Sequence, residues 1–553
     1  MSDALERAKT RYFRSRRVKA AACIIVLLAV VVLCDLRCGF DPIETLLDLP
    51  GSVVWSVEHF TPTLSSLDKL PKILLALWKT FLGAAAAALV SAVLAYVLAL
   101  AGCRAVGLGG AVRLLVRGIA SISRNIPNVA WAFMLMFSFG QSEFTGFLVL
   151  FMKSFGFLAR MFLETIDEVP QGAIDALRSV GATRAQIVFH ALIPLTSTQV
   201  ISWLLYMVET NARDATLVGM LTGSGIGFVF ELYYRTFRYD IAGLVIVCIA
   251  LMALLCEAVS NYVRRRIIAA DAQPSGAIRR RRGRAVTRVW TRSRVVTALT
   301  VSVLAGLTVC GFSQMSYGDV DLLRATFGAL NNFAAMALHP GTDGYWTMGE
   351  LLSDLGLTLA LAMLTTVIGA SLALLVALPA ACNLTNRAVS NAIKLVLSVI
   401  RAVPTIIWVL VFVVSISLGA EACIIGMMFH TVAFLAKAYS EAFEEVDPGV
   451  LEALRSTGAT WWQTVIHCIL PEKANDILSW TFLRLENNFV NTVVIAALCG
   501  SGGIGYELYL AANFYFSMHA VGLITYLCLA VSMALEAIAA RLHARFEVDR
   551  ASW

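Results

Sequence analysis

The chain of 553 residues repeats itself at an offset of 277 residues. A polar segment that separates two apolar stretches occurs once in each half, with identical internal spacing. Its shared positions are Asp175, Ala176, Leu177, Gly181 and Pro194 in the first copy and Glu452, Ala453, Leu454, Gly458 and Pro471 in the second. Outside this segment, the same register pairs Arg124 with Arg401, Glu209 with Glu486 and Asn211 with Asn488. The repeat therefore predicts two related units in one polypeptide.

Each unit is expected to lie in a membrane. Hydrophobic residues make up 59% of the chain and charged residues 15%, and the mean hydropathy is +0.76. A water-soluble core could not hide so much apolar surface. A helix needs about 20 mostly apolar residues to cross the bilayer, and twelve stretches qualify: 18–36, 71–101, 111–138, 143–163, 193–221, 241–263, 296–316, 352–382, 393–418, 421–442, 472–499 and 518–542. The sequence predicts an all-α polytopic membrane protein with two parallel repeats of about six transmembrane helices each.

The basic residues predict the orientation and the division of the chain. Lys and Arg are retained on the cytoplasmic side of membrane proteins. The N-terminal segment is basic, and residues 264–294 contain eleven arginines against one acid, Asp271. We therefore expect cytoplasmic termini, a first repeat at 1–263, a basic cytoplasmic linker at 264–294 and a second repeat at 295–553. Orientation in the bilayer and contact with lipid headgroups explain the arginines better than nucleic-acid binding does.

The repeated polar segment is expected to face the cytoplasm in both copies, because six crossings return the chain to the same side. Residues 168–190 are too polar to span and predict a short amphipathic helical hairpin. Gly181 permits a tight turn in its middle. Pro194 marks the start of the next transmembrane helix, where its missing amide donor does no harm. Two identical cytoplasmic hairpins suit a partner that is itself a dimer.

This segment resembles the coupling loop of importer-type ABC-transporter permeases. The resemblance rests on the acid-Ala-Leu triplet, the glycine four positions later and the Ile/Leu-Pro pair that follows, as they stand in both halves. In that family the loop seats a short helix that contacts the ATPase subunit. The resemblance implies that this chain docks two copies of an ABC ATPase. The alternative reading is an ordinary amphipathic loop.

The helix that follows each loop resembles the phosphonate-importer permeases. The first copy reads Glu209-x-Asn211-x-Arg213-x-Ala215-Thr216, then Gly223-Ser224-Gly225-Ile226-Gly227 and Glu231-Leu232-Tyr233. The second copy departs from this pattern at Val490, in place of the arginine, and at Val493, in place of the threonine. The resemblance implies a type I ABC importer permease fold, a place in the bacterial inner membrane and an extracytoplasmic substrate-binding protein as partner.

Ionisable residues at bilayer depth are costly and are candidates for function or for pairing. We expect the substrate pathway to include Arg124, Asn125, Glu209, Asn211, Arg213, Thr216, Arg401, Glu486 and Asn488. Structural Arg–Glu ion pairs would explain several of these charges equally. Arg213 could also be an arginine that snorkels to the outer interface, and the Asn and Thr side chains could simply join helices.

The glycine-rich stretches indicate a turn or a gate and not a phosphate cradle. They contain Gly223, Gly225 and Gly227 in the first half and Gly500, Gly502, Gly503 and Gly505 in the second. The GxxxxGK[ST] pattern of ATP-binding loops does not occur in the chain. We therefore expect no catalytic residues, no metal site and no cofactor in this chain, with ATP and Mg²⁺ held by the separate ATPase subunits.

These features favour one function over two alternatives. The leading hypothesis is the permease subunit of an ABC importer that carries phosphonate or a related phosphorus oxyanion. An importer of the same fold for methionine or another amino acid, or for phosphite or phosphate, is the alternative within the class. A secondary transporter driven by an ion gradient is the alternative of another class.

Overall fold

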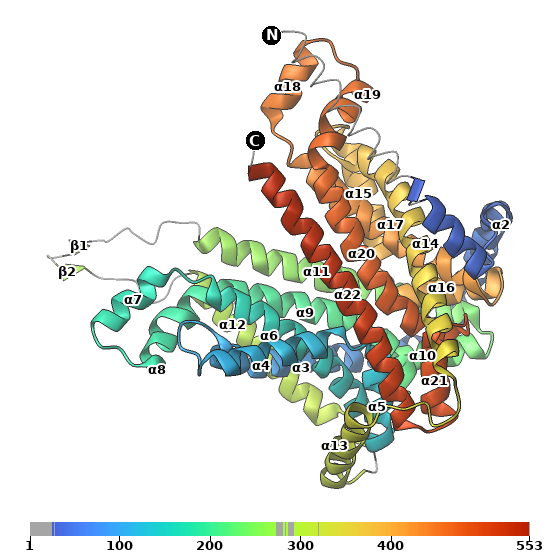
Figure 1. The fold of residues 1–553 in the computed structure, drawn as a ribbon, viewed down its shortest axis with the longest axis horizontal. Helices are drawn as coiled ribbons and strands as arrows, with labels where there is room; N and C mark the ends of the chain where they lie inside the picture. Colours follow the sequence, from blue (N-terminus) through green and yellow to red (C-terminus); the bar gives the residue numbers. More distant parts are fainter. Residues whose placement is uncertain are drawn as a thin grey trace.

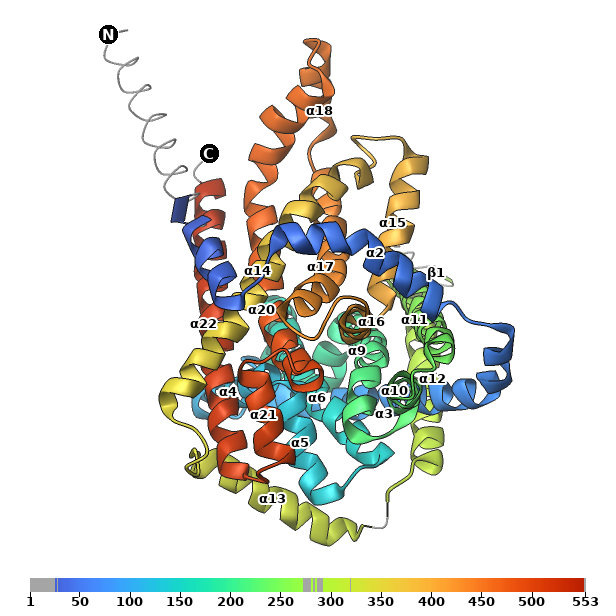
Figure 2. The ribbon, with the colours of Figure 1, turned by 90° about the vertical axis from the view of Figure 1, so that its right-hand side faces the viewer.

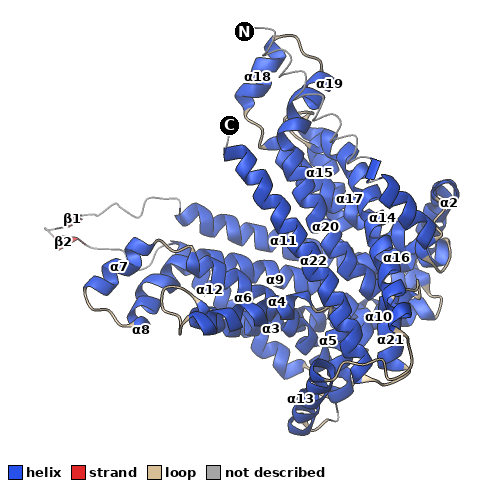
Figure 3. Ribbon diagram, viewed as in Figure 1, coloured by secondary structure: helices blue, strands red, loops and turns tan. Residues whose placement is uncertain are grey.

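Helices make up nearly all of the regular structure, as the sequence predicts (Figure 3). The computed structural model describes residues 25–26, 28–271, 280–281, 284–285, 292–318 and 320–551. The two strands found there, β1 (Arg280–Arg281) and β2 (Arg284–Ala285), form one small antiparallel pair. The two repeats contain the same order of helices, which confirms the predicted all-α membrane fold.

The helices of the first repeat are α2 (Pro42–Phe60), α3 (Leu70–Gly102), α4 (Gly110–Asn125), α5 (Asn128–Phe139), α6 (Glu143–Asp167), α7 (Gln171–Ser179), α8 (Arg184–Ile187), α9 (Ile193–Thr222), α10 (Gly225–Arg235) and α11 (Tyr239–Asp271). Those of the second are α12 (Arg292–Gln314), α13 (Leu322–Leu338), α14 (Met348–Ala380), α15 (Arg387–Ala402), α16 (Thr405–Ser415), α17 (Ala420–Glu444), α18 (Pro448–Ser456), α19 (Trp461–Thr464), α20 (Leu470–Cys499), α21 (Ile504–Asn513) and α22 (Met518–Ala551). Residues 28–38 are also helical and take the place of α12 in the first repeat.

Fewer helices than predicted could span a membrane by length and composition alone. Within the described residues, eight helices meet these criteria, or nine if the bent pair α15–α16 is one span. Twelve were predicted. Helix α20 matches the stretch predicted at 472–499, but the charges along it, among them Arg484 and Glu486, make it too polar. The stretch predicted at 18–36 lies partly outside the described residues.

A proline breaks one predicted span in each repeat. Pro127 separates α4 from α5, and Pro404 separates α15 from α16, with an angle of 84° between the second pair. Proline lacks the amide donor that would continue the helix, and it forces the preceding residue into an extended conformation. Ile126 and Val403 are both extended, with ψ of 125°. The stretches predicted at 111–138 and 393–418 are therefore each two helices, separated at a proline.

The two repeats diverge from a common base. In Figure 1, helices α3, α6 and α9 run to the left, whereas α15, α17 and α20 run to the top. The short helices α7 and α8 lie at the far end of the first group, and α18 and α19 lie at the far end of the second. Helices α5, α13 and α21 lie at the opposite end, where the groups meet. The molecule is V-shaped, and its two predicted docking segments are at the two tips.

The repeats exchange their first helices. Helix α12 of the second repeat packs along α3 of the first. The helix at 28–38 packs in turn on the second repeat, where Val31 and Cys34 lie against a cluster that contains Leu361 and Ile424. The next helices bridge the two repeats, because α2 contacts both α11 and α16, and α13 contacts both α22 and α5 (Figure 2). These helices tie the repeats together.

Candidate functional site

The two polar segments are helical hairpins, as predicted. Helices α7 and α8 are joined through Gly181, whose φ of +78° lies in the left-handed region that favours glycine. Gly458 joins α18 to α19 with a φ of +82°. A methyl group placed on either glycine would meet no atom within 4 Å. The backbone conformation of the turn, and not a shortage of space, is therefore what requires glycine.

Each hairpin is anchored by an arginine and carries a matching set of exposed residues. Arg178 Nη2 donates to the backbone oxygen of Ala105 (2.6 Å), just before α4. Arg455 Nη2 donates to the oxygen of Asn383 (2.8 Å), just before α15. The remaining loop residues follow one pattern in both copies. The acidic and alanine positions are exposed and the leucine is half-buried, at Asp175, Ala176 and Leu177 and at Glu452, Ala453 and Leu454.

Pro194 and Pro471 stand in the first turn of α9 and α20, as predicted from the tolerance of proline there. Each is preceded by a single π-helical turn, at 188–192 and 465–469. This turn carries an exposed apolar side chain in both copies, Phe189 at 66% and Ile466 at 53% exposure. The hairpins therefore present matching polar and apolar groups at the two tips of the V.

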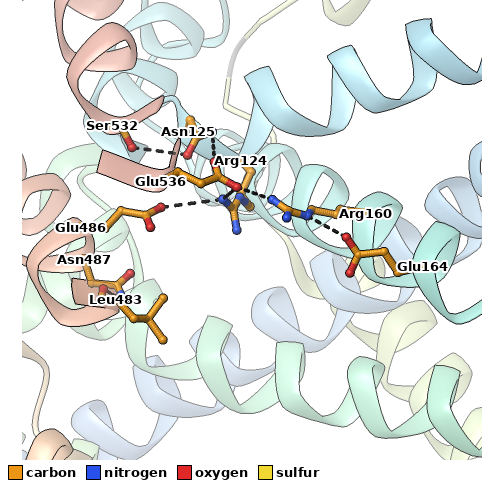
Figure 4. Close-up of polar contacts among 9 residues, drawn as sticks. All are labelled: Arg124, Asn125, Arg160, Glu164, Leu483, Glu486, Asn487, Ser532 and Glu536. Carbon is orange, nitrogen blue, oxygen red and sulfur yellow. Dashed lines mark hydrogen bonds and ion pairs between the residues drawn. The ribbon is translucent and has the colours of Figure 1, made fainter. Parts of the chain in front are cut away.

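Arg124 contacts carboxylates of the other repeat. Its Nη2 lies 2.6 Å from Glu536 Oε1 on α22 and 3.7 Å from Glu486 Oε1 on α20. Arg160 of α6 also pairs with Glu536, so that two first-repeat arginines share one second-repeat carboxylate (Figure 4). Asn125 Nδ2 donates to the other oxygen of Glu536 (3.2 Å). We call Arg124, Arg160, Glu486 and Glu536 the first ion-pair cluster.

The second ion-pair cluster mirrors the first. Arg401 Nη2 and Lys437 Nζ lie 3.7 Å and 3.6 Å from Glu257 Oε1 on α11. These bases belong to the second repeat and the carboxylate to the first. Arg401 and Lys437 stand 277 residues after Arg124 and Arg160. The two bases of each repeat therefore hold one carboxylate on the last helix of the other, in the same arrangement.

The sequence comparison missed the two shared carboxylates. Glu536 stands 279 residues after Glu257, and not 277, because the loops beyond α9 and α20 differ in length. A comparison at a fixed offset places Val259 opposite Glu536 and so hides the match. The Glu-Ala pair that occurs in the last helix of each half, Glu257-Ala258 and Glu536-Ala537, is the signal that would have found it.

Glu209 and Arg213 form a pair within α9. Arg213 Nη1 lies 2.8 Å from Glu209 Oε1, and Arg264 Nη2 lies 3.6 Å from Glu209 Oε2. Arg213 lines a cavity of about 240 Å³ between the repeats, together with Glu209 and Arg401. Its side chain is 20% exposed. This arginine therefore points into the cavity and forms an ion pair there.

The asparagines join helices. Asn211 Nδ2 donates to Ser154 Oγ on α6 (2.8 Å), and Asn488 Nδ2 donates to Thr366 Oγ1 on α14 (2.9 Å). Both side chains are fully buried, as is Thr216, and the cavity residues do not include them. Of the two roles considered for these three residues, the contacts of the asparagines correspond to interhelical packing.

The glycine-rich stretches form tight turns. Gly223 and Gly500 end α9 and α20 in left-handed conformation, with φ of +64° and +62°. A methyl group on Gly227 or Gly505 would lie 1.9 Å from a backbone oxygen of the preceding helix, so only glycine allows this approach. The others, Gly225, Gly502 and Gly503, have positive φ. After each turn a threonine hydroxyl accepts a hydrogen bond from a backbone amide. Thr80 Oγ1 accepts from Ile226, and Thr358 Oγ1 accepts from Ile504.

A second cavity, of about 810 Å³, adjoins the first ion-pair cluster. Five carboxylates and two arginines line it: Glu441, Glu445, Asp476, Glu486, Glu536, Arg124 and Arg160. We call it the acidic cavity. The cavity of about 240 Å³ is lined by three arginines, Arg213, Arg401 and Arg484, and by two carboxylates, Glu209 and Asp214. We call it the arginine cavity. The interface of the repeats thus holds two cavities of opposite charge.

Known transport proteins are similar to this chain in sequence. The phosphate-import permease protein PhnE of Mycolicibacterium smegmatis is 28% identical over 400 residues, which cover 72% of each chain. The phosphite transport system permease protein PtxC of Stutzerimonas stutzeri is 30% identical over 209 residues, 38% of this chain and 74% of that protein. A chain of the inward-facing MetNI methionine ABC transporter is 21% identical, with a TM-score of 0.33, and covers 36% of this chain and 96% of that one.

The family model described as "Binding-protein-dependent transport system inner membrane component" matches residues 91–268 and 366–548. The two matches fall on the two repeats and together cover more than half of the chain. Each includes one hairpin, one broken helix pair and the last helix that carries the shared carboxylate. The chain therefore belongs to the family of inner membrane components of binding-protein-dependent transport systems, with two family units fused in one polypeptide.

Proposed function

We propose that this chain is the complete permease of an ABC importer for phosphonate or a related phosphorus oxyanion, which an external binding protein delivers. The observation that carries the proposal is the double family match together with relatives named for this chemistry. These are the phosphate-import and phosphite permeases described above and a putative cryptic phosphonate permease, PhnE2 of Escherichia coli, 29% identical over 121 residues. Arginine cations at the interface of the repeats suit the passage of an anion.

The energy is supplied by two copies of an ABC ATPase, which hold ATP and Mg²⁺ and dock on the two hairpins. The exposed Asp175 and Glu452 loops and the apolar Phe189 and Ile466 support this assignment. When ATP draws the ATPases together, the tips of the V approach each other. Because Arg178 and Arg455 bind each hairpin to the loop before α4 or α15, the movement is passed to those helices.

The chain lies in the bacterial plasma membrane with its hairpins and termini in the cytoplasm. The first repeat, 1–263, and the second, 295–553, are joined by the basic linker 264–294, which remains on the cytoplasmic side. The substrate path passes between the repeats, beside the two ion-pair clusters. Arg213 and Arg401 contact it in the arginine cavity, and Arg124 and Glu486 contact it in the acidic cavity. The extracytoplasmic binding protein docks at the base of the V.

Reconstitution in proteoliposomes tests this function. We expect labelled phosphate, phosphite or methylphosphonate to enter only when the ATPase, ATP and a cognate binding protein are all present. Replacing both Gly181 and Gly458 with valine should leave ATP hydrolysis but abolish uptake, because the hairpin turns are lost. Normal uptake by this double variant would contradict docking through the hairpins.

Two other functions give different results in the same vesicles. Relatives named as methionine permeases occur in Pasteurella multocida and Bacillus subtilis, each 30% identical over parts that cover 22% of this chain. An importer for methionine would show ATP hydrolysis stimulated by a methionine-loaded binding protein and by none of the phosphorus oxyanions. A secondary transporter would move its substrate when the purified chain is present alone under an ion gradient.

A further inference from the structure

Arg484 is a buried arginine whose hydrogen-bond partners are all uncharged. It lies on α20 with 3% of its surface exposed. Its Nε and Nη2 donate to Thr431 Oγ1 (3.1 and 3.0 Å). Its Nη2 also donates to His430 Nδ1 (3.2 Å). A guanidinium group can only donate, so this histidine nitrogen accepts and carries no proton. The ring of Phe434 is a further neighbour, and its centre lies 5.4 Å from the guanidinium carbon.

The other charged groups of the arginine cavity are already paired. Arg213 binds Glu209 (2.8 Å), and Arg401 lies 3.7 Å from Glu257. Asp214 forms an ion pair with Lys153. Within the part of the chain that the structure describes, Arg484 has no carboxylate oxygen within 4.0 Å. A buried cation without a counter-ion costs several kcal/mol, which indicates that an anion from outside the chain completes this site.

The first repeat offers no such group at the matching place. The residue 277 positions before Arg484 is Met207, which is buried among apolar side chains. The position of His430 is occupied by Lys153, which is paired with Asp214. The unpaired positive charge is therefore a feature of one repeat and not of the duplicated fold.

We propose that Arg484, with Arg213 and Arg401, forms an oxyanion-binding site inside the membrane, where the transported anion rests during each cycle. This inference rests on the proposed function and adds the residues that hold the substrate. Guanidinium groups match the oxygens of phosphate-like anions with paired N–H donors. Arg484 lines a cavity of about 240 Å³, and Asn491 and Tyr206 add uncharged polar groups. One such site between the two repeats gives a single resting place per cycle.

The substitution Arg484→Met tests the site, because methionine is the residue that the first repeat uses at the matching position. Inorganic phosphate is added to the purified chain in detergent, and the thermal unfolding midpoint is recorded. We expect phosphate to raise the midpoint of the wild type and to leave that of Arg484→Met unchanged, since a ligand stabilises only a form that binds it. Without phosphate the variant should unfold no earlier than the wild type, because it removes an uncompensated buried charge.

A matched control removes a base outside the cavity. Lys394→Met breaks an ion pair with Glu444 near the second hairpin. This variant should keep the full phosphate-dependent shift. Arg484→Lys keeps the charge but loses the planar guanidinium group, and we expect a reduced shift. Sulfate and chloride at equal ionic strength separate a specific site from a general salt effect, and an equal shift with chloride would overturn the proposal.

Uptake by the full complex separates failure of this site from failure of the proposed function. With saturating binding protein, we expect Arg484→Met to lower phosphate uptake about tenfold or more, as loss of a charged hydrogen-bond donor does. The site is overturned, and the function stands, if the wild type imports phosphate and Arg484→Met imports it equally well. The same holds if phosphate raises the unfolding midpoint of Arg484→Met as much as that of the wild type. A wild-type complex that carries none of the phosphorus oxyanions would overturn both.

Discussion

The ion-pair clusters and the arginine cavity differ in how far they keep the symmetry of the duplication. In the clusters, each repeat contributes two bases that hold one carboxylate of the other repeat, Glu536 or Glu257. In the arginine cavity, Arg213, Asp214 and Arg484 stand opposite Val490, Asn491 and Met207 of the other repeat. Contacts that join the repeats have kept their pattern, whereas charged groups that line this cavity have diverged. Fusion in one chain permits this, because each half mutates separately.

Placing an unpaired arginine at the matching position of the first repeat should have the largest effect on stability. We expect Met207→Arg to lower the free energy of unfolding by about 3–5 kcal/mol, as an uncompensated buried charge does. Ser154, the counterpart of Thr431, already accepts a hydrogen bond from Asn211, and the counterpart of His430 is the basic Lys153. Thermal unfolding in detergent measures the loss. Met207→Leu is the control, with a cost below about 1.5 kcal/mol. A stable Met207→Arg chain would show that the repeats are interchangeable here.

The first ion-pair cluster should give the next largest effect. Glu536→Gln removes the carboxylate shared by Arg124 and Arg160. We expect a loss of about 2 kcal/mol, less than for a fully buried pair because the side chains are partly exposed. Chemical denaturation of the purified chain measures it. Glu441→Gln, in the same cavity but exposed, should change the stability little, and equal losses in the two variants would count against a specific cluster.

The hairpin turns should respond equally in the two repeats. Alanine at Gly181 or at Gly458 must adopt a left-handed backbone at φ of +78° or +82°. This costs about 1 kcal/mol for a residue with a side chain. The affinity of the ATPase for each single variant, measured by titration, should fall by the same factor. A large difference between Gly181→Ala and Gly458→Ala would show that docking is not symmetric.

The second ion-pair cluster should give the smallest effect. Its bases lie 3.6 and 3.7 Å from Glu257, whereas Arg124 lies 2.6 Å from Glu536. We therefore expect Glu257→Gln to cost about 0.5 kcal/mol, as weak ion pairs do. Denaturation under the conditions used for Glu536→Gln allows direct comparison. A larger cost for Glu257→Gln than for Glu536→Gln would reverse the ranking drawn from the distances.

Local features of this molecule could be predicted from the sequence, and long-range contacts could not. The hairpin at 168–190, its break at Gly181 and the helix start at Pro194 follow from residue types and spacing. The exchange of α12 and the helix at 28–38 depends on which apolar faces fit together in three dimensions. Periodicity along the chain does not contain that information.

The candidate site was predicted in part, for a related reason. Arg124, Arg213 and Arg401 were found as charges at bilayer depth, and all three line a cavity between the repeats. Arg484 was missed because the comparison followed residues shared by the repeats, whereas Met207 stands opposite this arginine. A functional residue that is present in only one repeat cannot be found by matching the two halves. Arg484 is visible in the sequence only as a charged residue at a position where the two repeats differ.

The mass of the purified complex tests most directly the claim that one chain provides both halves of the permease. Native mass spectrometry of the chain isolated with its ATPase is expected to show one permease chain with two ATPase subunits. One ATPase per chain, or two permease chains in each complex, would contradict the account.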